Sequence, residues 1–225
     1  MPTALVIGAS RGIGLEFARQ YLADGWRVFG TFRSEADRIR LRDMGVQTLK
    51  LEVLQANDLA AVSWQLDDED FDVVIMNAGV YGPRTSNIQR PPTEDEFDQV
   101  MRTNVLSTMR LMPLVTPLLS RSRGTLAFIS TRMGSISEAA ASYGMLYRVS
   151  KAAVNMVAKL AHSDLSSLGV RVITLHPGWV RTDMGGPNAE VEVGASVSGM
   201  RRLIGESLAF PSGGFFDYRG QALAW

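Results

Sequence analysis

The chain has 225 residues, of which 46% are hydrophobic and 20% are charged, and its 23 basic and 23 acidic residues give a formal net charge of zero. This composition is that of an ordinary globular protein and excludes a disordered or collagen-like chain. A chain without net charge does not attract nucleic acid or anionic membranes by charge alone, so we expect neither as a partner. The absence of cysteine excludes disulfides, thiolate metal ligands and cysteine nucleophiles.

No targeting segment or membrane span is expected. The first apolar run, Ala4-Leu5-Val6-Ile7, ends in a glycine and predicts a strand rather than a signal peptide. No apolar stretch reaches the ~20 residues that a membrane-spanning helix needs. Together with the lack of cysteine, which fits a reducing compartment, this predicts a cytoplasmic protein.

Short apolar runs alternate with amphipathic segments along the chain. The runs predict strands over residues 4–8, 27–31, 46–51, 72–76, 124–130, 171–176 and 214–217. The segments between them predict helices over residues 12–24, 34–44, 57–65, 93–119, 142–168 and 194–207. Most of the runs lack polar alternation, which is typical of parallel strands covered on both faces. We therefore predict an α/β fold with a single Rossmann-like, doubly wound parallel sheet of about seven strands and helices on both faces.

Two predicted helical stretches, residues 105–119 and 152–161, are apolar on almost every side. Such a helix packs against two partners, of which the sheet is one. We expect a second subunit to be the other, in a homodimer or homotetramer rather than a monomer. Pro113 and Pro117 should kink or loosen the first stretch. The chain predicts a single domain over residues 1–225 with a short substrate loop near 178–199.

A glycine-rich segment, Gly8-Ala9-Ser10-Arg11-Gly12-Ile13-Gly14, follows the first predicted strand and opens the first predicted helix. Glycines there allow a sharp turn and let backbone N–H groups reach a pyrophosphate at the helix N-terminus. A plain strand-to-helix turn is the alternative, but the position in a βαβ unit favours a nucleotide site. The residues expected to bind the cofactor are Gly8, Ser10, Arg11, Gly12, Ile13 and Gly14.

Charge near the second predicted strand indicates which nucleotide binds. Sites that prefer NAD carry an acidic residue about 20 positions after the glycine loop. Here the corresponding region reads Gly30-Thr31-Phe32-Arg33-Ser34 and contains no acid. Arg33 and Arg11 can both pair with a 2′-phosphate, so we expect NADP(H) in preference to NAD(H). The alternative is a pair of solvated arginines.

Tyr147 and Lys151 lie four residues apart on a predicted helix and share one face. An ordinary tyrosine has a pKa near 10 and keeps its proton at neutral pH. A nearby ammonium lowers that pKa, so Tyr147 can exchange a proton with a substrate oxygen. Lys151 can also bind a nicotinamide ribose. The spacing alone more often belongs to a solvated helix face, so the assignment depends on the other motifs.

These motifs resemble those of the short-chain dehydrogenase/reductase family over the whole chain. The matches in chain order are Gly8-x-x-x-Gly12-x-Gly14, Asn77-Ala78-Gly79, Asn104, Ser130-Thr131, Tyr147-x-x-x-Lys151 and Pro177-Gly178. Within the family, three segments resemble the C-factor-like or sniffer-like carbonyl reductases: residues 132–136, residues 177–184, and residues 214–218 with Trp225.

The resemblance implies roles that the pattern alone does not assign. Tyr147 would be the acid/base, and Asn104, Thr131 and Lys151 would complete the catalytic set. The backbone carbonyl of Asn104 would hold a water linked to Lys151 in a proton relay. Glu52 and Val53 would lie beside the adenine, Asn77, Ala78 and Gly79 beside its ribose, and Val180 and Thr182, after Pro177 and Gly178, beside the nicotinamide carboxamide.

Three positions depart from the family's pattern. The substrate-orienting serine is normally the second of two, where this chain has Ser130 followed by Thr131. We favour Thr131, because position in a strand fixes side-chain direction, although its β-branch stiffens the side chain. Ser130 and Ser135 are the alternatives. Ile7 replaces a threonine, which predicts the loss of one hydrogen bond to the glycine loop, and Glu52 replaces the usual aspartate.

The sequence thus predicts an NADPH-dependent oxidoreductase that reduces the carbonyl of a small substrate to an alcohol. The apolar residues Met133, Met145, Trp179 and Met184 favour an apolar aldehyde, ketone or quinone. The alternative is an NADP-binding signalling or interaction protein with little or no turnover, because C-factor-like relatives are named for developmental signalling.

No metal site is expected. His162 and His176 lie far apart in the sequence and have no Cys or Glu partner at metal-ligand spacing.

Overall fold

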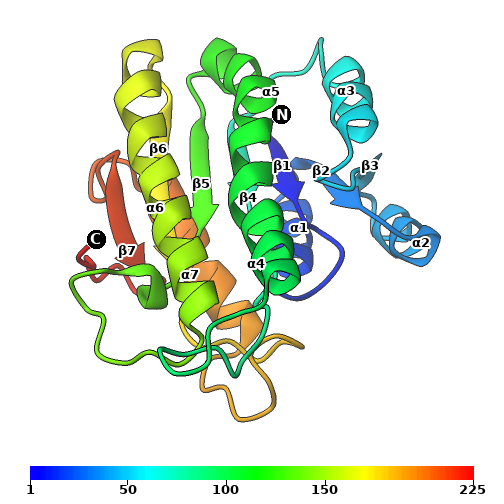
Figure 1. Ribbon diagram of the computed structural model, residues 1–225. Coiled ribbons are helices and arrows are strands. Elements are labelled where there is room, and N and C mark those ends of the chain that lie inside the picture. Colours follow the sequence, from blue (N-terminus) through cyan, green and yellow to red (C-terminus); the bar gives the residue numbers. More distant parts are fainter.

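The computed structural model describes residues 1–225 and contains a seven-stranded sheet in the order β3-β2-β1-β4-β5-β6-β7 (Figure 1). All six strand pairs are parallel. The strands are β1 (Thr3–Ile7), β2 (Arg27–Phe32), β3 (Gln47–Lys50), β4 (Val73–Met76), β5 (Thr125–Ile129), β6 (Arg171–His176) and β7 (Gly214–Asp217). The prediction of a doubly wound parallel sheet is confirmed.

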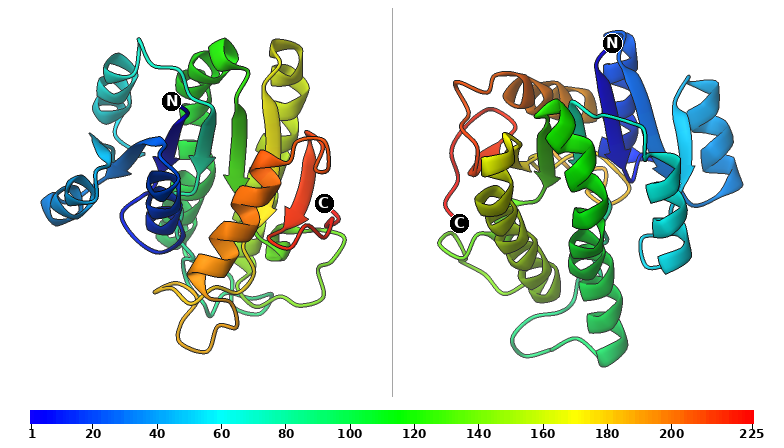
Figure 2. Two further views of the ribbon diagram at one scale, coloured as in Figure 1. Left: turned by 180° about the vertical axis from the view of Figure 1, so that it is seen from behind. Right: turned by 90° about the horizontal axis from the view of Figure 1, so that it is seen from above.

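The helices cover both faces of this sheet (Figures 1 and 2). On one face lie α3 (Ala56–Gln65), α4 (Glu94–Met101), α5 (Ser107–Ser122) and α6 (Met145–Leu165), and on the other α1 (Gly12–Ala23), α2 (Glu35–Asp43) and α7 (Val193–Gly205). None of these helices is both long and apolar enough to cross a membrane.

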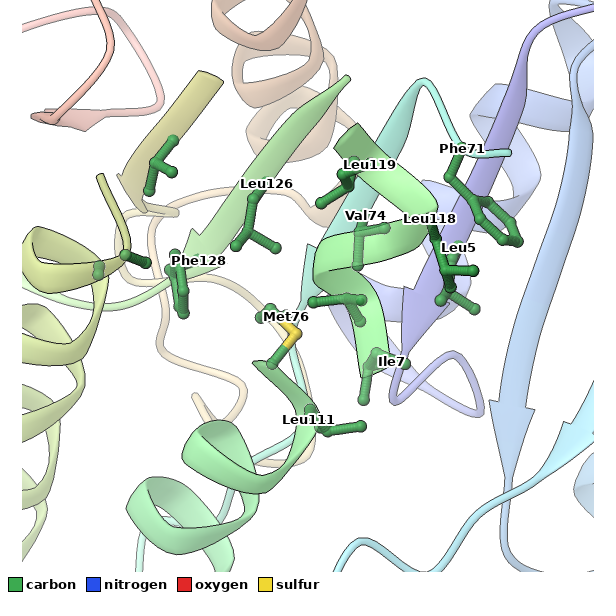
Figure 3. Close-up of a cluster of buried hydrophobic side chains, with 14 of the residues drawn as sticks. Leu5, Ile7, Phe71, Val74, Met76, Leu111, Leu118, Leu119, Leu126 and Phe128 are labelled. Atoms are coloured by element: carbon green, nitrogen blue, oxygen red, sulfur yellow. The ribbon is translucent and has the colours of Figure 1, made fainter. Parts of the chain in front are cut away.

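Successive side chains of a strand point to opposite faces of the sheet and so belong to two separate cores. Leu5 and Ile7 of β1 belong to the core under α5 and α6, whereas Ala4 and Val6 belong to the core under α1 and α7. Figure 3 shows the first core, in which strand residues such as Leu126 meet helix residues of α5. Because both faces of the central strands are buried, these strands read as continuous apolar runs in the sequence.

The predicted helix over residues 93–119 is interrupted in the structure. It consists of α4, a π-helical turn at Arg102–Leu106 and α5, and Asn104 lies at the centre of the π turn. A π turn is rare and commonly occurs at functional positions in helices. Helix α4 begins with a capping box, in which Thr93 accepts from the Glu96 N–H and the Glu96 carboxylate accepts from the Thr93 N–H.

Helix α5 continues through Pro113 and Pro117, so neither proline ends it. Both prolines lie on the exposed side of α5. The carbonyls that lose an N–H partner belong to residues four positions earlier, and Met109 is itself half exposed. Water can satisfy these carbonyls, so α5 runs on while its other face, including Leu111 and Val115, stays buried.

The carboxyl ends of the strands point toward the lower half of Figure 1, where the loops that follow them gather. These loops are the glycine-rich segment after β1 and the segments over residues 77–93, 130–144 and 177–192. The direction in which successive strands are added reverses between β1 and β4. From β1 the chain adds β2 and β3 on one side, and it then returns to add β4 on the other side of β1. Ligands of open α/β sheets bind at such a reversal.

Candidate active site

The glycine-rich loop forms a tight cradle after β1. Gly8 and Gly12 adopt positive φ angles of 88° and 53°, which glycine adopts without strain. A Cβ at Gly14 would lie 2.0 Å from the Gly8 carbonyl oxygen, so no larger residue fits there. Asn77 donates from Nδ2 to the same carbonyl at 2.9 Å and fixes the loop to the end of β4. This cradle at the N-terminus of α1 fits the pyrophosphate of a dinucleotide.

The hydrogen bond expected to be lost at Ile7 is supplied from another strand. The Gly8 N–H donates to Oγ1 of Thr31 at 2.7 Å, and Thr31 is buried at the end of β2. The glycine loop therefore keeps a hydroxyl partner although Ile7 has none. No motif marks Thr31, because the contact joins positions 23 residues apart.

Three arginines lie around the adenosine side of the cradle. Arg11 pairs with Asp183 at 3.2 Å, and Arg33 pairs with Glu52 at 3.6 Å. Arg40 of α2, which the sequence analysis missed, donates to the backbone carbonyl of Ser10. The side chains of Arg11 and Arg33 remain 63% and 64% exposed, so both are accessible to an anion despite their partners.

The other predicted residues of this side take scaffold positions. The backbone N–H of Glu52 donates to Oδ2 of Asp58 at 2.8 Å, and Val53 is buried in the first core. A Cβ at Gly8 would lie 3.0 Å from Cα of Ala78. A Cβ at Gly79 would lie 3.2 Å from Asn104 Oδ1, so glycine lets the chain after β4 approach the π turn.

The loop after β6 folds over the glycine cradle. Gly178 has a φ of 83°, and the buried Val180 forms a bridge with Val191. A Cβ at Gly12 would contact Cγ2 of Thr182 at 3.2 Å. Pro177, Gly178, Val180 and Thr182 therefore lie on the chain segment that reaches from the sheet edge to the cradle.

Asn104 ties the π turn to two other elements. Its Oδ1 accepts from the Val80 N–H at 2.8 Å, and its Nδ2 donates to the Val80 carbonyl at 2.9 Å and to Ser150 Oγ at 3.0 Å. Its backbone carbonyl accepts from Thr108 Oγ1 at 2.7 Å.

Tyr147 and Lys151 share the face of α6 that is turned toward β5. The Lys151 ammonium donates to the Ile129 carbonyl at 3.0 Å and lies 5.9 Å from the centroid of the Tyr147 ring. The expected lowering of the Tyr147 pKa by Lys151 is not found. Burial raises the pKa of Tyr147 above its usual value, and the nearby Tyr81 adds to that rise. The phenol is therefore held protonated, which is the form of a general acid.

Lys151 is itself buried, and this burial lowers its pKa to about 8. The group therefore changes protonation close to neutral pH, where a proton donor operates most effectively. It uses one of its three N–H donors on Ile129. Two donors remain for other partners.

The three candidate hydroxyls near β5 differ in what they can still donate. Ser130 Oγ donates to Asn155 Oδ1 at 2.5 Å inside the core. Ser135 Oγ donates to the Trp225 carbonyl at 3.4 Å and accepts from the Glu138 N–H. Thr131 Oγ1 accepts from the Met133 N–H at 3.2 Å, so its own O–H stays free to donate. This arrangement favours Thr131 as the residue that orients a substrate oxygen.

Tyr81, which the sequence analysis missed, stacks on Tyr147 with ring centroids 4.4 Å apart and planes at 18°. It follows Asn77-Ala78-Gly79 in the loop after β4. No pattern in the sequence marks it, because the stack joins the loop after β4 to α6. His, Asp and Glu side chains form no group of three that could hold a metal ion.

A family model described as short chain dehydrogenase matches residues 2–192. This chain belongs to the short-chain dehydrogenase family. The C-signal protein of Myxococcus xanthus is 37% identical over 158 residues, which are 68% of this chain and 92% of that relative.

Two solved structures align with the whole chain. A short-chain dehydrogenase/reductase from Burkholderia multivorans with bound NADP has a TM-score of 0.89 and 31% identity, with 100% of this chain and 99% of that chain covered. The carbonyl reductase Sniffer of D. melanogaster has a TM-score of 0.88 and 26% identity, with 100% of each chain covered. The resemblance to C-factor-like and sniffer-like members of the family is confirmed.

Proposed function

We propose that the protein is an NADPH-dependent reductase of a carbonyl group. The observation that carries the proposal is Tyr147, a buried phenol on the same helix face as the buried Lys151. This pair and the glycine cradle lie at the same end of the sheet, where the strands have their carboxyl ends. An acid at that end fits protonation of a carbonyl oxygen whose carbon is being reduced.

NADP(H) is the proposed cofactor. The cradle of Gly8, Gly12 and Gly14 fits a pyrophosphate, and the exposed guanidiniums of Arg11 and Arg33 fit a 2′-phosphate. The bound NADP in the Burkholderia multivorans structure supports this choice. NADPH, when bound, supplies the hydride that the carbonyl carbon receives.

The chain's own residues supply the proton and its path. Tyr147 gives its phenolic proton to the substrate oxygen, and the free O–H of Thr131 donates to the same oxygen, so charge that develops on it is stabilised. Lys151 returns a proton to Tyr147 through a water held at the carbonyl of Asn104. We propose that the other residues expected from the family resemblance also contact the cofactor. These are Ser10, Ile13, Glu52, Val53, Asn77, Ala78, Gly79, Pro177, Gly178, Val180 and Thr182.

The rim of the site supports a substrate with an apolar body. Trp179 is 52% exposed and Met184 is 36% exposed on the loop after β6. Such side chains leave water when an apolar ligand covers them, which contributes to binding. We propose that the substrate is a small apolar aldehyde, ketone or quinone. We also propose that the protein is cytoplasmic, and that each subunit is a single domain and assembles into a homodimer or homotetramer.

The test is NADPH oxidation by the purified protein against a panel of carbonyl compounds, with Tyr147→Phe alongside. We expect turnover that falls by ~10²–10⁴ in the variant, because it removes the proton donor and keeps the ring. Tyr21→Phe is the matched control, since it deletes a buried phenol on α1 that has no hydrogen-bond partner. Equal turnover in Tyr147→Phe and the wild type would contradict the proposal.

The second candidate is an NADP-binding signalling protein with little turnover. The similarity to C-signal is the observation that favours it. Thermal protection by NADPH together with no turnover on any carbonyl would select this candidate. The intact set of Asn104, Tyr147 and Lys151 favours the reductase.

A further inference from the structure

Two guanidinium groups near Tyr147 have no carboxylate partner. The guanidinium carbon of Arg84 lies 4.7 Å from the ring centroid of Tyr81, and that of Arg148 lies 4.8 Å from the ring centroid of Tyr143. Their hydrogen-bond acceptors are backbone carbonyls, of Met184 for Arg84 and of Tyr143 for Arg148. We call Tyr81, Arg84, Tyr143 and Arg148 the entrance cluster.

Three arginines of other loops do have carboxylate partners. Arg11, Arg132 and Arg181 each pair with a carboxylate of a nearby loop. The entrance cluster therefore keeps uncompensated positive charge. Burial raises the pKa of Tyr81, Tyr143 adds to that rise, and Arg84 and Arg148 oppose it.

The entrance cluster is joined directly to the reacting phenol. The Tyr81 ring stacks on Tyr147 at 4.4 Å, and Arg84 lies over the Tyr81 ring. A Cβ at Gly144 would lie 2.6 Å from Tyr81 Oη, so the start of α6, which carries Arg148, packs against Tyr81. A group bound by Arg84 would therefore be separated from Tyr147 by the ring of Tyr81.

We infer that the substrate carries, besides its carbonyl, a carboxylate or phosphate group that Arg84 and Arg148 bind. This inference rests on the proposed reductase and narrows its substrate to an apolar body with an anionic end. A guanidinium has five N–H donors, and one carbonyl acceptor leaves most of them free. Arginine binds carboxylate and phosphate oxygens through such donors.

The test compares three aldehydes of similar size: 4-carboxybenzaldehyde, 4-formylphenyl phosphate and the neutral methyl 4-formylbenzoate. Dissociation constants are measured by calorimetry on the complex with NADP⁺, which has no hydride to transfer, and kcat/KM is measured with NADPH. The variants are Arg84→Gln, Arg148→Gln and the charge-preserving Arg84→Lys. Arg90→Gln is the matched control, because Arg90 is exposed on the same loop as Arg84 and its side chain has no ion-pair partner.

We expect at least one anionic aldehyde to bind about tenfold or more tightly than the neutral ester, with the advantage falling at high salt. The Gln variants should lose the advantage and keep the affinity for the ester, and Arg84→Lys should restore part of it. The better of the two anions identifies the group as carboxylate or phosphate.

Equal affinity for all three aldehydes, including no measurable binding of any, would overturn the inference. A parallel loss of ester binding in the Gln variants would also overturn it, because the arginines would then only shape the entrance. Turnover of all three aldehydes without charge selectivity would contradict the anion site and support the proposed reductase. Charge-selective binding without turnover would contradict the proposed reductase and support the anion site.

Discussion

Ser130 donates a 2.5 Å hydrogen bond from its hydroxyl to Oδ1 of Asn155 on α6. Both residues are buried, and Asn155 in turn donates to the Gly134 carbonyl at 3.1 Å. The Ser130 hydroxyl proton is therefore committed to the contact between β5 and α6. Thr131, the next residue, has an uncommitted hydroxyl proton.

This difference predicts opposite results for substitutions at the two positions. Thr131→Val should lower kcat/KM by ~10²-fold, because it removes a donor to the substrate oxygen and preserves the β-branched shape. Thr131→Ser should keep most of the activity. Ser130→Ala should lower stability by ~1–3 kcal/mol, since it leaves Asn155 without one buried partner, while kcat changes little.

Steady-state kinetics and denaturant unfolding of the three variants check this prediction. A large fall of kcat in Ser130→Ala with unchanged stability would instead assign the orienting role to Ser130.

Gly14→Ala should disable the glycine cradle. The new Cβ would lie 2.0 Å from the Gly8 carbonyl oxygen and 2.7 Å from Asn77 Nδ2, so the loop must move. We expect a loss of ~1–3 kcal/mol in stability and weak NADPH binding, measured by unfolding and fluorescence titration. Gly205→Ala is the control, because no atom lies within 4 Å of its Cβ position and alanine is the better helix former. Equal effects of both substitutions would contradict the cradle.

Arg33→Ala should weaken the preference for NADPH over NADH. The substitution removes an exposed guanidinium that faces the expected 2′-phosphate, so KM for NADPH should rise by ~10-fold or more while KM for NADH stays constant. Arg11→Ala should act in the same direction. Arg40→Ala should raise KM for both cofactors, because Arg40 holds the Ser10 carbonyl of the loop rather than a phosphate.

Initial rates with each cofactor at varied concentration distinguish these cases. Equal rises of KM for NADPH and NADH in Arg33→Ala would place Arg33 outside the 2′-phosphate site.

Lys151→Met should abolish turnover and stabilise the cofactor-free protein. Burial lowers the pKa of Lys151 to about 8, so below pH 8 the folded protein carries a buried ammonium at a cost in free energy. Above pH 8 the folded protein releases this proton, while the unfolded chain keeps it to ~pH 10.4. The gain from Lys151→Met should therefore be ~1–3 kcal/mol below pH 8 and shrink between pH 8 and 10.4.

Thermal unfolding of the wild type and variant from pH 6 to 10 measures this gain. Lys159→Met is the control, since Lys159 is exposed on the same helix and its replacement removes no buried charge. A lower melting temperature for Lys151→Met at every pH would show that the bond to the Ile129 carbonyl outweighs the cost of burial.

The strands were predictable because the sheet is covered on both faces, which leaves long apolar runs such as that of β1. Helix boundaries were less predictable, since they depend on single backbone conformations. Helix α6 begins at Met145 rather than at residue 142 because Gly144 has a φ of 63°. That α5 continues through Pro113 and Pro117 depends on both prolines lying on its exposed side.

The candidate site was predictable wherever a residue belongs to a spaced motif, as Tyr147 and Lys151 do. It was not predictable where a role arises from contact between distant segments. Thr31 on the Gly8 N–H and Tyr81 on the Tyr147 ring are of this kind. The raised pKa of Tyr147 also depends on burial, which the spacing of two residues does not reveal.

The π turn at Arg102–Leu106 has a consequence for changes in chain length. A π turn holds one more residue than the α-helical turn it replaces. Deleting one residue there would leave Val100 of α4 and Leu111 of α5 in phase with the sheet, whereas a deletion elsewhere in α5 would rotate its buried face by about 100°. Deleting Asn104 itself would also remove its hydrogen bonds to Val80 and Ser150, so the change in length that the helix tolerates best falls on a residue that joins three elements of the site.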